Sequence, residues 1–276
     1  MNAIIISAVW GIIMMFAGVF IKSKTAPKYL AIAGMTLAFA ANFMELNTGK
    51  AWFTFDTHDM LRMSSFNLTF IAVALGSVLL YFLLSGSDIE RVGPHISEYF
   101  ALIFFVTCGV ALVATFNTLL ILFIGIEILS IPLYILTGSD KRNLRSNEAA
   151  LKYFLMGSFS TGILLMGIAF IYGGSPNATF YITNIPLGLG KMPVMIAIGL
   201  VLLMVAMSFK VSAAPFHFWT PDVYDGAPTV FTSFMSTVVK AAGFFAFIRL
   251  FENAFGMVQP QWQKLIVIIT IATLLI

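Results

Sequence analysis

Long apolar runs, separated by short polar stretches, dominate the pattern of hydrophobic and polar positions along this chain. Each run is close to the ~20 residues that an α-helix needs to cross a bilayer. The predicted spans are 3–21, 29–46, 67–85, 99–116, 118–137, 151–172, 192–214 and 229–251, and a ninth begins near Leu265. A lysine and a proline close the seventh run, so that helix is expected to be broken. The pattern predicts an all-α polytopic membrane protein with one broken helix.

Composition supports this interpretation. The chain is 60% hydrophobic and 10% charged, whereas soluble domains carry about 25% charged residues. The net charge of +3 forms no basic face outside the loops, so we expect membrane lipid as a partner and no nucleic acid.

The sequence lacks the usual motifs for redox, nucleotide and metal chemistry. Cys108 is the single cysteine, so no disulfide or cysteine cluster can form within the chain. His58, His95 and His217 are not at helical spacing from one another, and neither dinucleotide-binding nor Walker glycine motifs occur. We expect no cofactor or metal to be bound by this chain.

Basic residues indicate the orientation. They cluster in the segments Lys22–Lys28 and Lys141–Arg145, which fall on one side if the spans alternate. The positive-inside rule places that side in the cytoplasm, with the 215–228 segment toward it and the N-terminus in the periplasm. The bias is modest, because some basic residues fall on the other side: Lys50, Arg62, Lys191, Arg249 and Lys264. No basic segment precedes span 1, so we expect it to stay as an anchor.

The last residues, 265–276, are apolar and stop in the middle of a span. We interpret the chain as a fragment of a longer protein. Helix-bundle transporters often contain two inverted repeats, and we expect only the first of them here.

Glu127 lies about ten residues into its span, near mid-depth. It shares one helical face with Ser130 and Tyr134, and Pro132 can kink the helix there. Ionisable groups at this depth are functional candidates by default. A structural ion pair that joins two helices is the alternative.

Lys210 ends an apolar run and precedes the proline break. A lysine at membrane depth costs roughly 2.5–3.5 kcal/mol on insertion scales, and a helix break frees backbone groups that need partners. Transporters build ion sites from this combination, although Lys210 could also cap the freed carbonyls. His217 follows seven residues later and suits a proton shuttle, or it packs against Trp219.

Lys240 lies about twelve residues into its span, too deep for easy snorkelling. Thr229, Ser233 and Ser236 precede it at helical spacing, and this stripe could hold a file of water leading to the ammonium. Glu127, Lys210 and Lys240 together suggest a path for protons or cations.

Lys152 lies near a helix start, four residues after Glu148. The two form an i,i+4 pair. The pair could belong to a proton relay, or it could be an interfacial ion pair.

Three segments resemble one family, the proton-translocating subunit N of bacterial respiratory complex I, which is the counterpart of mitochondrial NADH dehydrogenase subunit 2. They are Lys210-Val-Ser-Ala-Ala-Pro-Phe-His217-Phe-Trp-Thr-Pro-Asp222-Val-Tyr-Asp-Gly226-Ala-Pro-Thr229, Ile-Glu127-Ile-Leu-Ser-Ile-Pro-Leu-Tyr134 and Glu148-Ala-Ala-Leu-Lys-Tyr-Phe. The first resembles a signature that sister subunits and cation/proton antiporter subunits share, but its Asp-Val-Tyr-x-Gly-Ala-Pro variant is more similar to subunit N. The resemblance covers most of residues 99–253.

The resemblance implies an antiporter-like helix bundle. It matches Glu127 to the family's mid-membrane glutamate, Lys210 to the lysine of the broken helix and Lys240 to the central lysine of the next helix. It matches His217 and Lys152 to polar relay positions. The implied division of the single membrane domain 1–276 is spans 1–3 in 1–98, the first repeat in 99–253 with its break near 208–228, and a truncated span in 264–276.

The implied function is a proton-translocating membrane subunit of NADH-quinone oxidoreductase. The chain would then be enzymatic only as part of this translocase, in a bacterial inner membrane. NADH, flavin, iron–sulfur clusters and quinone would belong to partner subunits. The membrane partners would be a sister antiporter-like subunit and small membrane subunits. A cation/proton antiporter subunit of the Mrp type is the main alternative, and a passive scaffold is a third.

Overall fold

A computed structural model describes residues 1–21, 23, 25–176, 178–185 and 192–276. Within these ranges the chain is helical, apart from loops and two isolated bridges. The α-helices are α1 (Asn2–Phe20), α2 (Ala26–Thr48), α3 (Ser65–Val92), α4 (Ile96–Thr115), α5 (Leu119–Thr137), α6 (Leu144–Gly174), α7 (Val194–Val211), α8 (Trp219–Gly226), α9 (Thr229–Phe234), α10 (Lys240–Ile248) and α11 (Gln259–Leu275). Two π-helical segments, Met235–Val239 and Arg249–Ala254, continue α9 and α10, and Ile182–Asn184 and Gly256–Val258 form 3₁₀ turns.

Eight of the nine predicted membrane spans are confirmed, and the segment of the ninth forms helix α11, which begins at Gln259 rather than near Leu265. In the described part of the chain eight helical stretches are long and apolar enough to cross a bilayer, the last being the combined stretch Thr229–Ala254. Several helices are longer than their predicted apolar runs, α3 and α6 by the largest margin. Helix α6 begins at Leu144 rather than 151, where the Asn143 side chain accepts a hydrogen bond from the Arg145 amide. Hydropathy marks only the apolar part of a helix, whereas a cap extends it into the polar interface.

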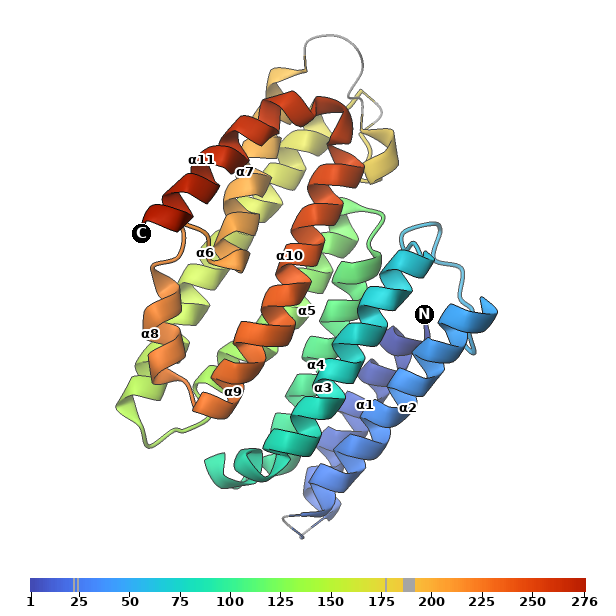
Figure 1. Ribbon diagram of the computed structural model, residues 1–276, viewed down its shortest axis with the longest axis vertical. Helices are drawn as coiled ribbons and strands as arrows, with labels where there is room; N and C mark the ends of the chain where they lie inside the picture. The colour runs from blue at the N-terminus through green and yellow to red at the C-terminus, as the bar shows by residue number, and fades with distance from the viewer. Residues whose placement is uncertain (22, 24, 177, 186–191) are drawn as a thin grey trace.

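Helix α4 lies at the centre of the bundle, between the α1–α3 group and the α5–α7 group (Figure 1). It is the most buried of the spans, with 78% of its apolar window covered. Small residues allow this close packing: a Cβ on Gly109 would lie 2.6 Å from the Leu129 backbone nitrogen of α5. Helices approach closely in membranes where such small side chains meet.

Helices α6 and α7 also cross at glycine. A Cβ added to Gly199 would lie 2.7 Å from the carbonyl oxygen of Gly167, and one added to Gly167 would lie 3.0 Å from the Gly199 oxygen. The backbones are therefore in near contact, which holds the first turns of α7 against α6.

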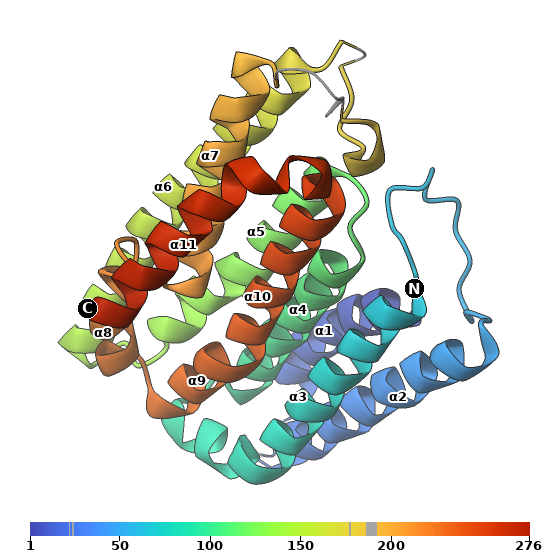
Figure 2. The ribbon, with the colours of Figure 1, turned by 45° about the horizontal axis from the view of Figure 1, so that its top comes forward.

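The predicted break follows α7. Ser212 takes a left-handed conformation, with φ 59° and ψ 39°, and α8 starts only at Trp219. Pro215 lacks an N–H and cannot continue the helix. Helix α11 returns toward the break, with the C-terminus beside α8 in both ribbon views (Figures 1 and 2). There, the hydroxyl of Thr273 accepts a hydrogen bond from the freed Ala214 amide at 2.9 Å. The division into 1–98, 99–253 and 264–276 stays a prediction.

Candidate functional site

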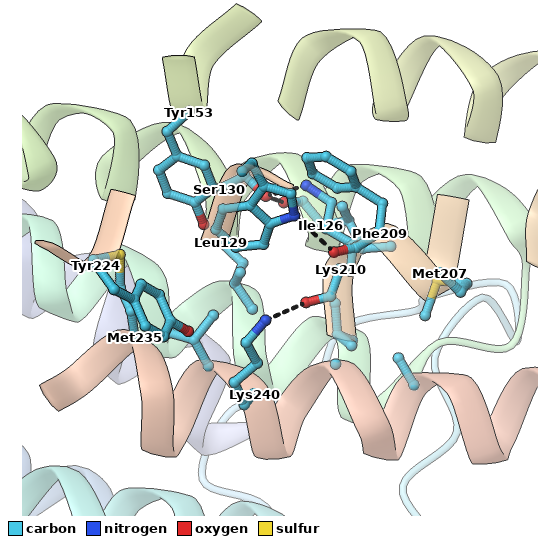
Figure 3. Close-up of a pocket in the computed structure, with 15 residues that line it drawn as sticks. Ile126, Leu129, Ser130, Tyr153, Met207, Phe209, Lys210, Tyr224, Met235 and Lys240 are labelled. Atoms are coloured by element: carbon cyan, nitrogen blue, oxygen red, sulfur yellow. Dashed lines mark hydrogen bonds between the residues drawn. The ribbon is translucent and has the colours of Figure 1, made fainter. Parts of the chain in front are cut away.

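Lys210 occupies the last turn of α7 and reaches toward α5. Its half-buried ammonium donates a hydrogen bond to the Ser130 hydroxyl at 2.9 Å. Ser130 is buried, and its hydroxyl donates to the carbonyl of Ile126 at 2.5 Å. This pair of bonds connects the charged end of α7 to the middle of α5 (Figure 3).

Glu127 lies about one turn before Ser130, the residue on α5 that accepts the hydrogen bond from Lys210. It forms no ion pair within 4.0 Å in the described part of the chain, so the structure shows no ion pair of Glu127 joining two helices. Its Oε1 atom is buried and has no hydrogen-bond partner among the described residues. A buried carboxylate oxygen needs a proton, a water molecule or a donor, which makes Glu127 a suitable group for proton exchange.

Lys240 caps the broken end of α7. Its ammonium donates to the Lys210 carbonyl at 3.2 Å and to the Ser212 hydroxyl, and it lies 4.8 Å from the ring centroid of Trp219. The last carbonyls of a helix lack intrahelical partners and form the negative end of its dipole. Capping, considered above for Lys210, is therefore performed by Lys240.

The stripe of Ser and Thr side chains that was expected to lead to Lys240 does not reach its ammonium group. Thr229, Ser233 and Ser236 are exposed on the surface of this chain, and Ser233 and Ser236 donate to carbonyls of their own helix at 2.7 and 3.1 Å. The π-helical segment Met235–Val239 explains the difference, because its wider turn rotates the following residues relative to an α-helical register. Lys240 consequently points into the bundle.

A small cavity lies between the two lysines. Its volume is about 30 Å³, which is room for about two water molecules. Figure 3 shows its polar side chains converging from different helices. They are Ser130, Tyr153, Lys210, Trp219, Tyr224 and Lys240. The site thus forms where α5, α6, α7, α8 and α10 meet.

Aromatic side chains define one wall of this cavity. Trp219 stacks on Tyr153 of α6 with ring centroids 4.8 Å apart, and its Nε1–H donates to the Phe209 carbonyl at 3.2 Å. Burial raises the pKa of Tyr224 to about 12, so this phenol keeps its proton at neutral pH. Helix α8 therefore presents neutral hydrogen-bonding and π surfaces to Lys240.

Lys152 lies outside this cavity and joins α6 to α8. Its ammonium is 2.7 Å from Glu148, which confirms the predicted i,i+4 contact, and 2.6 Å from Asp222 of α8. Asp222 is a residue that sequence reasoning did not single out. It stood in the quoted motif, but only the fold brings residues 152 and 222 together.

His217 lies in the break and does not line the cavity. Its ring stacks on Phe218, with centroids 5.0 Å apart, rather than on Trp219. Its Nδ1 atom is buried without a hydrogen-bond partner among the described residues. A shuttle role for His217 stays a prediction.

Arg249 was counted among the basic residues on the side opposite the basic loops, near the end of the predicted span 229–251, and the structure buries it inside the bundle. Its guanidinium donates to the carbonyls of Ala114 and, at 2.7 Å, of Phe116, and lies over the Phe116 ring. It therefore caps the C-terminal end of α4. In the sequence, the position of Arg249 near the end of an apolar run was the feature that could have indicated this buried role. Lys22, Lys24 and Lys191 lie outside the described residues.

These features define a class: a polytopic helix bundle whose interrupted transmembrane helix carries a half-buried lysine that faces the bundle interior, as helix-bundle ion transporters do. The family described as NADH:quinone oxidoreductase/Mrp antiporter, TM, matches residues 116–276. The chain is 39% identical over its whole length to NADH-quinone oxidoreductase subunit N of Cytophaga hutchinsonii, and 37% identical over 98% of its length to that of Trichlorobacter lovleyi. It spans 59% and 55% of those two proteins. The chain belongs to the NADH:quinone oxidoreductase/Mrp antiporter family.

Solved structures agree on the fold. A chain of respiratory complex I from Thermus thermophilus superposes with a TM-score of 0.74 at 33% identity, covering 90% of this chain and 52% of that one. A chain of the Mrp complex from Dietzia has a TM-score of 0.72 at 19% identity, covering 92% and 49%. The second match shows the antiporter-like fold alone.

Proposed function

We propose that this chain forms part of a proton-translocating membrane subunit of NADH-quinone oxidoreductase. The observation that carries the proposal is the placement of Lys210 and Lys240 on one cavity at the break of α7. The names of the relatives and the match to a complex I chain support the same assignment. Electron transfer from NADH to quinone, with its flavin and iron–sulfur clusters, takes place in partner subunits.

Protons pass from Lys210 to Lys240 in this proposal. Burial disfavours the charged form of an ammonium, and a neighbouring carboxylate favours it, so a change in the position or charge of Glu127 changes how firmly Lys210 holds its proton. Ser130, which accepts from Lys210, orients the ammonium. The cavity between the lysines has room for the water that transfer requires. Lys152 and His217 supply polar positions nearer the cytoplasmic end.

The surroundings of the chain follow from the same assignment. The protein spans a bacterial inner membrane with its N-terminus in the periplasm, and the segments 22–28 and 138–147 face the cytoplasm. A sister antiporter-like subunit and small membrane subunits are its membrane partners. The Mrp-type alternative shares the fold, but the relatives at 37–39% identity favour the oxidoreductase.

The test uses the full-length protein in membrane vesicles from its own organism. The double variant Glu127→Gln/Lys210→Ala should abolish most NADH-driven proton uptake while the complex still assembles. Sodium-dependent proton flux without NADH would support the antiporter instead. Intact NADH-driven pumping in the assembled double variant would leave the chain as a scaffold.

A further inference from the structure

Ser212 ends α7 in a backbone conformation that serine rarely adopts. Its φ of 59° lies in the left-handed region, where helices usually end with glycine because a side chain is sterically disfavoured there. If only the backbone turn mattered, glycine would be the more favourable residue at this position. The hydroxyl at this position therefore calls for an explanation of its own.

That hydroxyl is the hydrogen-bond partner of two groups. It accepts from the Lys240 ammonium, and the Thr220 hydroxyl donates to it at 2.6 Å. The other contacts of the ammonium are the Lys210 carbonyl and the faces of the Trp219 and Tyr224 rings, which lie 4.8 and 6.0 Å from it. A carbonyl only accepts hydrogen bonds, whereas a hydroxyl both donates and accepts. Among these contacts of Lys240, only Ser212 can accept from the charged ammonium and donate to the neutral amine.

Ser212 also lines a second cavity, on the far side of the Lys240 site. This cavity has a volume of about 260 Å³ and lies between α7, α10 and α11. Ser208, Ser212, Thr270 and Thr273 provide its hydroxyls, and the Ser208 hydroxyl is buried with no partner among the described residues. The two cavities share no lining residue. The hydrogen bond between Lys240 and Ser212 connects them.

We propose that Ser212 is a proton relay between Lys240 and the cavity beside α11, which rests on the function proposed above. In the step, the N–H bond of Lys240 breaks and its proton binds Ser212 Oγ, while the original hydroxyl proton of Ser212 passes to a water molecule in the second cavity. Lys240 becomes a neutral amine, and Ser212 remains a neutral hydroxyl that now donates to it. Thr220 holds the Ser212 oxygen in place throughout. The left-handed turn is what aims the hydroxyl at both groups.

The experiment compares Ser212→Gly with Ser212→Thr in the full-length protein within its native complex. Glycine relaxes the left-handed turn but removes the hydroxyl, and threonine keeps the hydroxyl but strains the turn further. A relay predicts that Ser212→Gly slows NADH-driven proton uptake about tenfold and that Ser212→Thr retains more uptake than Ser212→Gly. Ser175→Gly, at the end of α6, is the control and should pump normally. Uptake by Ser212→Gly equal to wild type, or higher than by Ser212→Thr, would overturn the relay.

Two further variants separate this inference from the proposed function. Lys240→Ala should lose proton uptake, and Ser212→Gly/Lys240→Ala should be no worse than Lys240→Ala, because both residues act in one step. If Lys240→Ala pumps normally, the proposed path through Lys240 is wrong and the relay with it. If Lys240→Ala fails and Ser212→Gly pumps normally, the relay alone is wrong.

Discussion

The side-chain ammonium of Lys240 donates a hydrogen bond to the backbone carbonyl of Lys210 at 3.2 Å. One lysine thus stabilises the helix end that carries the other. Their ammonium groups point to different partners, because Lys210 reaches Ser130 of α5. Any change in the charge of Lys240 therefore acts directly on the break that positions Lys210.

Removing the charge of Glu127 should reduce the coupling of proton uptake to NADH oxidation. Glu127→Gln is expected to lower NADH-driven proton uptake several-fold in an assembled complex, because Lys210 loses its nearby negative charge. Glu127→Asp should be milder, since the charge survives on a shorter side chain. The measurement is proton uptake per NADH oxidised in membrane vesicles. Near-normal uptake by Glu127→Gln would remove this residue from the path.

A residue at position 210 that keeps the positive charge but cannot release a proton should also impair transport. Arginine cannot lose its proton in the physiological range, so Lys210→Arg should lower proton uptake by at least about tenfold. Lys50→Arg, at an exposed position after α2, is the matched control and should have little effect. If Lys210→Arg pumped like wild type, the lysine would be an electrostatic anchor.

The contact between α6 and α8 should affect transport through Lys240. Asp222→Asn weakens the bond that holds α8 to Lys152, and α8 carries the Trp219 ring that covers Lys240. We expect a moderate fall in proton uptake, smaller than for Glu127→Gln. Asp225→Asn is the control, because Asp225 makes only a longer 3.7 Å contact with Arg145 on the same surface. Equal effects of the two variants would argue for a general charge effect.

Orientation can be tested by cysteine labelling. Ser23→Cys and Lys141→Cys lie in the basic loops, and both positions are exposed, whereas the Ser139 hydroxyl is buried. A membrane-impermeant reagent should label them only from the cytoplasmic face. Thr54→Cys, exposed at the opposite end, should label from the periplasm. The native Cys108 is buried and should stay unlabelled. The reverse pattern would invert the topology.

The crossing of α6 and α7 should tolerate no extra methyl group. Gly199→Ala would place a Cβ 2.7 Å from the Gly167 carbonyl, and overpacking of this kind costs about 1–3 kcal/mol of folding free energy. The thermal midpoint of the purified protein should fall. Gly162→Ala, where a Cβ meets nothing within 4 Å, should leave it unchanged or raise it. Equal midpoints would show that the helices shift apart at little cost.

The sequence by itself determined the membrane spans, the place of the helix break and the ionisable residues inside the bundle. Each depends on local properties. A run of apolar side chains must lie in lipid, Pro215 cannot continue α7, and a charge such as Glu127 is identified by the apolar residues on either side of it. The i,i+4 contact of Glu148 with Lys152 is equally local, because both lie on one helix.

Only the tertiary structure decided which groups meet. Side-chain partners depend on how each helix is rotated about its axis, and the π-helical segment before Lys240 changes that rotation in a way that apolar spacing does not reveal. As a result, the ammonium of Lys240 contacts the carbonyl of Lys210 and not the row of Ser and Thr hydroxyls that was expected to lead to it. In the same way, Asp222 reaches Lys152 and Arg249 caps α4 across long sequence separations. Backbone carbonyls freed at helix ends attract these cations, and where such ends lie in space is a property of the packed bundle.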